Sequence, residues 1–83
     1  MNTKVLVKIM GGVEEKLDVR FDYHHPDFQK FVLYVREQYD FMKRVIPSKY
    51  SKYLIDETVN RIALQLLMGL SPFMIPNVEG KVE

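Results

Sequence analysis

The residues with the clearest potential for chemistry are two adjacent histidines, His24 and His25, which stand between Asp22 and Asp27. Imidazole and carboxylate groups are common metal ligands, so this run is a candidate metal site. Adjacent side chains of an extended backbone point in opposite directions, which keeps both imidazoles from reaching one ion. A connection between a strand and a helix explains the same residues, and we therefore expect neither a metal nor a cofactor here.

Other catalytic arrangements lack their essential parts in this sequence. The chain has no cysteine, which removes disulfides, thiol nucleophiles and thiolate metal sites together. No serine or threonine lies in a strand-to-helix elbow that would expose a nucleophile, and no glycine-rich loop precedes a helix to hold phosphate. We therefore expect a protein without catalytic residues and without enzymatic activity.

The most uneven distribution of charge lies between Asp40 and Asp56, where basic residues and tyrosines occur without an intervening acid. Basic residues interleaved with tyrosine are typical of a surface that contacts phosphates and stacks on bases. The alternative interpretation is a helix end followed by a solvated loop. This basic segment contains Lys43, Arg44, Lys49, Tyr50, Lys52 and Tyr53.

Length and composition predict one small folded domain over residues 1–83. Apolar residues make up 47% of the chain and charged residues 28%, which is typical of a globular protein. The net charge of +1 gives the whole molecule no strong field for attracting nucleic acid or an anionic membrane. The chain shows neither a leader-like start nor a run long enough to span a membrane, so we expect a cytoplasmic protein.

The first part of the chain is predicted to form a β-hairpin. From residue 13 to residue 23 the odd positions are apolar except for Glu15, and the even positions up to 22 are charged. This alternation is the period of a strand with one buried face, and residues 3–9 repeat it. We therefore expect strands at about 3–9 and 13–22, joined by a turn at Gly11 and Gly12.

Charge pairing selects one register for this hairpin. A loop of Met10, Gly11 and Gly12 avoids opposing like charges and places Gly12 at the left-handed position that closes the turn. The alternative two-residue turn mixes the two faces of the hairpin. In the selected register the pairs are Lys4 with Asp18, Val5 with Leu17, Lys8 with Glu14 and Ile9 with Val13.

Two long helices are predicted after the hairpin, at about 26–46 and 51–69. Pro26 and Asp27 suit a helix start, and apolar residues then recur at helical spacing as far as Pro47. The second helix begins between Ser48 and Leu54 and ends near residue 69. The expected fold is two-layer α+β, with the hairpin packed on the two helices. We expect residues 71–83 to form an extended, partly flexible tail that can add a short edge strand.

The two predicted helices carry more apolar surface than their own packing requires. Leu64 and Met68 extend the apolar face of the second helix around its back, and Tyr34 and Phe41 widen that of the first. Either a partner or the tail covers these four residues. We expect a small non-enzymatic interaction module or regulator that binds protein partners there, most simply as a homodimer. The alternative is a regulator that binds nucleic acid through the basic segment.

The predicted order of elements resembles one known family. The sequence Leu-Asp-Val-Arg-Phe at 17–21, followed by two helices joined at 47–51, is similar in order to a ribbon-helix-helix repressor. In that family a two-stranded ribbon reads the major groove, and the second helix helps to form the dimer. This chain departs from the pattern, because Asp18 and Asp22 point outward from the candidate ribbon and an extra strand occupies the hairpin. We do not assign the chain to the family.

Overall fold

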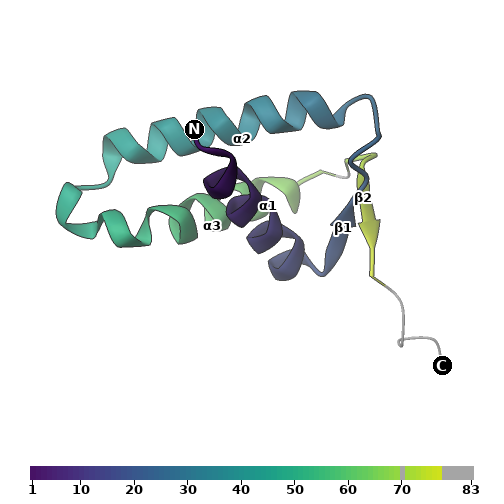
Figure 1. Cartoon of the computed structure of the whole chain (residues 1–83). Helices are drawn as coiled ribbons and strands as arrows, with labels where there is room; N and C mark the ends of the chain where they lie inside the picture. Colours follow the sequence, from purple (N-terminus) through teal and green to yellow (C-terminus); the bar gives the residue numbers. More distant parts are fainter. Residues whose placement is uncertain (70, 78–83) are drawn as a thin grey trace.

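The computed structural model describes residues 1–69 and 71–77, which form three helices around a small core with a two-stranded sheet at one end (Figure 1). The long helices α2 and α3 run antiparallel, and α1 crosses them (Figure 1). In chain order the elements are α1 (Thr3–Leu17), β1 (Val19–Phe21), α2 (Phe28–Val45), the 3₁₀ helix η1 (Ser48–Tyr53), α3 (Leu54–Leu66) and β2 (Met74–Pro76).

The predicted N-terminal hairpin is wrong, because residues 3–17 form helix α1. Apolar residues recur at every fourth position of α1, at Val5, Ile9, Val13 and Leu17. A spacing of four fits both the two-residue period of a strand and the period of a helix. Val7 belongs only to the strand pattern, and its side chain is 63% exposed. The side chain of Asn2 caps the helix by accepting a hydrogen bond from the Lys4 backbone N–H at 2.6 Å.

The predicted turn and its register fail together with the hairpin. Gly12 lies inside α1 and faces α3, where an added Cβ would stand 2.8 Å from Cγ2 of Val59. Its role is to let the two helices approach closely. The left-handed residue is instead Asp18, with φ 56° and ψ 52°, which ends α1. The four residue pairs of the predicted register cannot form, since seven of their members lie within one helix and Asp18 caps it.

The partner of β1 comes from the other end of the chain. β1 pairs antiparallel with β2, with Val19 opposite Pro76 and Phe21 opposite Met74. Part of the predicted second strand is therefore extended, and the tail supplies its partner in place of residues 3–9. Residues 78–83, which belong to the predicted flexible tail, lie outside the described residues.

The core lies where the three helices meet the sheet. Ile9 and Val13 of α1, Val35 of α2 and Ile62 of α3 have fully buried side chains. An aromatic cluster closes the end nearest the sheet, with the ring of Phe31 4.9 Å from that of Phe73 and 5.0 Å from that of Phe21. The two helices predicted at 26–46 and 51–69 are observed as α2 and as η1 with α3.

Candidate interaction surfaces

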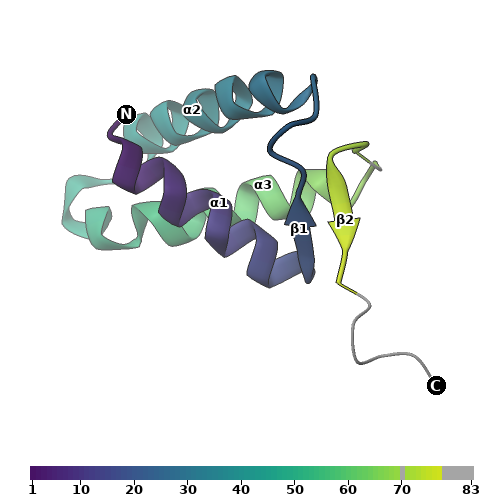
Figure 2. The ribbon, with the colours of Figure 1, turned by 45° about the vertical axis from the view of Figure 1, so that its right-hand side comes forward.

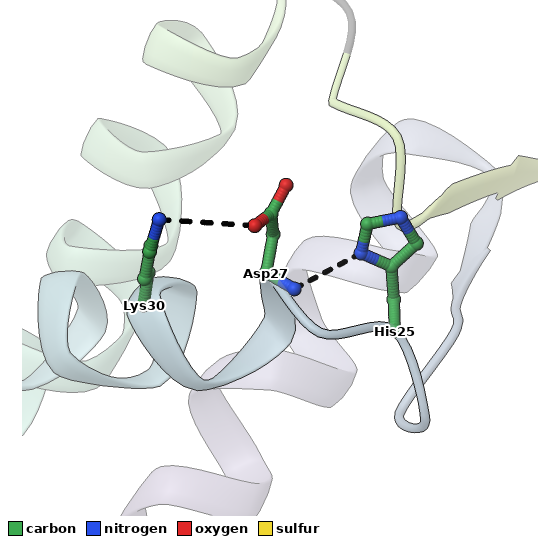
Figure 3. A network of polar contacts seen from close by, with 3 residues as sticks. All are labelled: His25, Asp27 and Lys30. Carbon is green, nitrogen blue, oxygen red and sulfur yellow. Dashed lines mark hydrogen bonds and ion pairs between the residues drawn. The ribbon is translucent and has the colours of Figure 1, made fainter.

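The side chain of His25 stabilises the turn that precedes α2 (Figure 3). Nδ1 of His25 accepts a hydrogen bond from the backbone N–H of Asp27 at 3.0 Å, and the Asp27 carboxylate lies 3.9 Å from Nζ of Lys30. The backbone N–H of His24 donates to the carboxylate of Asp22 at 3.0 Å. Among residues 1–69 and 71–77 no group of three or more histidine, aspartate or glutamate side chains is arranged to hold a metal ion.

Three exposed apolar side chains lie together at the end of α3. Leu64 is 65% exposed, Leu67 is 71% exposed and Met68 is 86% exposed. The chain keeps helical hydrogen bonding just past Leu66, so residues at this spacing share one side of the helix. We call these three residues the α3 patch. The described part of the tail pairs with β1 and leaves the patch uncovered.

An open groove between α1 and α3 borders the α3 patch. Leu17 and Lys16 form its α1 side, and Asn60 and Ala63 form its α3 side together with two residues of the patch, Leu64 and Leu67. The groove is apolar apart from the lysine and asparagine side chains at its margins. Leu67 was not among the predicted interface residues, although its position three residues after Leu64 is a signal that it shares the same side of the helix.

Tyr34 and Phe41, which the sequence predicts at the interface, connect α2 to α3. The hydroxyl of Tyr34 donates a hydrogen bond to Oε1 of Gln65 at 2.5 Å. The guanidinium of Arg61 lies 4.7 Å from the centre of the Phe41 ring and also donates to Oε1 of Gln38. Tyr34 is half-buried, and Phe41 is 36% exposed. Burial raises the pKa of Tyr34 above its usual value, and the nearby positive charge of Arg61 partly opposes that rise.

The basic segment lies at the opposite end of the α2–α3 pair from the sheet, where α2 ends and η1 begins (Figure 1). Its six predicted residues are all exposed. Each of its four cations lies over an aromatic ring. The distances from cation to ring centre are 5.5 Å for Lys43 over Tyr39, 6.0 Å for Arg44 over Phe41, 5.2 Å for Lys49 over Tyr50 and 5.2 Å for Lys52 over Tyr53.

A small hollow lies on the inner side of η1. Lys43 and Ile46 from the end of α2, Ser48 and Ser51 from η1, and Leu54 from the start of α3 line it. The two serines were not predicted as site residues. The sequence feature that could have pointed to them is the repeated tripeptide Ser-Lys-Tyr, which occupies the whole of η1.

The chain has no match among known protein families, curated proteins or solved structures. In the part of the chain that the structure describes, no helix has both the length and the apolar character needed to cross a membrane.

Proposed function

We propose that this protein is a small, non-enzymatic interaction module of the cytoplasm that forms a homodimer through the α3 patch. The observation that carries the proposal is the exposure of Leu64, Leu67 and Met68, which are at least 65% exposed while adjacent on one helix side. Single exposed apolar residues are ordinary, whereas a contiguous apolar patch is typical of a protein contact. Methionine at its edge suits such a surface, because its flexible side chain adapts to a partner.

A second copy of the chain is the simplest occupant of the α3 patch. None of the three patch residues is charged. Two identical patches can therefore meet without repulsion between like charges within the patch. A twofold contact uses the same patch on both subunits and covers both at once. A chain of 83 residues has a small core, so the added burial is a large gain relative to its own stability.

The oligomeric state of matched variants tests this proposal. We expect light scattering during size-exclusion chromatography to give about twice the 9.8 kDa mass of one chain at high micromolar concentration. Leu64→Lys should give the single-chain mass, because dimerisation would bury its ammonium group without a partner charge.

Leu33→Lys is the matched control, because Leu33 is also an exposed leucine on a helix, with 61% exposure. It should remain a dimer, and both variants should keep their helical circular dichroism. Two outcomes would contradict the assignment to the α3 patch. One is a wild-type chain that stays monomeric up to high micromolar concentration, and the other is loss of the dimer in both variants alike.

A further inference from the structure

The two halves of η1 have the same sequence, Ser-Lys-Tyr, and each half holds its lysine over the ring of the tyrosine that follows. A 3₁₀ helix has three residues per turn, so residues three apart share one side. Ser48 and Ser51 accordingly line the same hollow. Tyr50, with φ −107° and ψ 16°, departs from helical geometry, so a kink separates the two halves.

Each tyrosine of η1 has an exposed ring with the ammonium group of the preceding lysine over one face. Tyr50 and Tyr53 are each 47% exposed, and Nζ of the preceding lysine lies 5.2 Å from each ring centre. An exposed ring can stack on a base, and an adjacent ammonium group can contact the phosphate of the same nucleotide. The unit of one lysine and one tyrosine therefore provides both parts of a contact with a nucleotide, and η1 contains it twice.

The cations near η1 are available to an anion. The one ion pair within the described residues joins Lys30 to Asp27, so none of the four cations of the basic segment is paired with a carboxylate there. Lys43 and Arg44 from the last turn of α2 extend the positive surface. Asp56 and Glu57 stand in the first turn of α3 and limit the positive surface on that side.

We propose that η1 and the last turn of α2 bind single-stranded nucleic acid. Lys43, Arg44, Lys49 and Lys52 contact its phosphates, and Tyr50 and Tyr53 stack on its bases. A single strand is the occupant because its bases can leave their own stack and reach the rings, which those of a duplex cannot. An anionic membrane is disfavoured, since η1 consists of serine, lysine and tyrosine and has no aliphatic side chain to insert among lipids.

This surface is separate from the α3 patch. Both views place η1 at the end of the molecule away from β1 and β2 (Figures 1 and 2), whereas the patch lies at the end of α3 from which the chain leads to β2. A dimer formed through the α3 patch therefore leaves η1 accessible. Binding of nucleic acid does not require the dimer, and the two proposals can fail independently.

Fluorescence anisotropy with a labelled oligo-deoxythymidine of about 20 nucleotides tests the phosphate contacts. Four contacts on a single strand predict a slope of about −3 for log affinity against log salt concentration. Lys49→Gln with Lys52→Gln should bring the slope to about −1.4. The control, Lys4→Gln with Lys8→Gln, removes the same charge from exposed positions of α1 and should leave the affinity within about twofold.

Tyrosine variants test the stacking. Tyr50→Leu with Tyr53→Leu should weaken binding at least fivefold, whereas the corresponding double phenylalanine variant keeps both rings and should bind like the wild type. Four results would each overturn the proposal: no binding at low salt, equal losses in the two lysine variants, tighter binding to the matching duplex, and binding to phosphatidylserine vesicles but not to the oligonucleotide. The last result would assign the surface to a membrane.

Discussion

The two neighbouring glycines of α1 differ in the space around them: Gly11 is open and Gly12 is packed against α3. Substitution by alanine should therefore change the free energy of unfolding in opposite directions at the two positions. Nothing lies within 4 Å of a Cβ added at Gly11, so Gly11→Ala should raise the free energy of unfolding by about 1 kcal/mol, the gain in helix propensity. At Gly12 the added Cβ meets Val59, whose β-branched side chain is held in one rotamer within a helix. Overpacking of this kind costs about 1–3 kcal/mol and outweighs the propensity gain.

Urea denaturation of the two variants measures this difference. Gly12→Ala should be less stable than the wild type, and Gly11→Ala should be more stable. Adding Val59→Ala to Gly12→Ala should recover part of the loss, since the smaller side chain gives the new methyl group room. Equal stabilisation by the two single variants would show that α1 and α3 do not approach closely at Gly12.

Tyr34 should make the stability of the fold sensitive to high pH. Burial raises its pKa above the usual 10.0, so the folded protein holds the phenolic proton more tightly than the unfolded chain does. The resulting stability is fully present below pH 10.0 and is lost as the pH rises through the pKa of the folded state. Ionisation also removes the hydrogen bond from its hydroxyl to Gln65.

A pH series of thermal unfolding temperatures measures this effect. Tyr34→Phe should lower stability by about 1 kcal/mol near neutral pH, because the hydrogen bond to Gln65 is lost. Its curve above pH 10 should fall less steeply than that of the wild type. Some decline should remain, since burial and the charge of Glu14 also raise the pKa of Tyr23. Parallel curves for the two proteins would rule out Tyr34 as a source of the decline.

At the scale of the elements, sequence pattern correctly predicted a helix wherever the apolar spacing fits a helix and does not also fit a strand. Phe28, Phe31 and Val35 recur at a period that no strand satisfies, and α2 forms there. In α1 a spacing of four residues satisfied both periods, and the adjacent glycines resembled a turn. Helix formation prevailed because α1 buries Ile9 and Val13 against the other helices. The pairing of β1 with the distant β2 is non-local, and alternation along one strand does not identify its partner.

Glu14 connects α1 to the sheet, and its removal should loosen β1. Its Oε2 accepts hydrogen bonds from the backbone N–H of Phe21 at 2.8 Å and from the hydroxyl of Tyr23 at 3.1 Å. Glu14→Ala should cost about 1–2 kcal/mol and speed hydrogen exchange at the Phe21 amide. Glu15→Ala, at an exposed neighbouring position, is the control and should change neither quantity. Unchanged exchange in Glu14→Ala would mean that this connection is not formed.

For the whole molecule, sequence pattern predicted residues of both surfaces, whose binding roles stay predictions, and it missed how the fold places these residues together. Leu64 and Met68 were predicted from an apolar run, but the groove beside them exists only because residues 16 and 17 belong to a helix that packs on α3. The interface role of Tyr34 stays a prediction, and its hydrogen bond to Gln65 depends on how α2 and α3 pack, which sequence pattern does not reveal. In η1 the repeat places both serines at one hollow and each lysine over the ring of the next tyrosine, and the sequence alone does not show this arrangement.

Self-association through the α3 patch is tested most directly by the methyl resonances of the methionines in a protein labelled with ¹³C-methyl methionine. Met68 is 86% exposed in the patch and Met10 is 6% exposed in the core, so each chain carries a probe and its own control. As protein concentration rises from low to high micromolar, the Met68 resonance should shift and broaden while that of Met10 stays fixed. A Met68 resonance that does not change across this range would contradict a homodimer formed through the α3 patch.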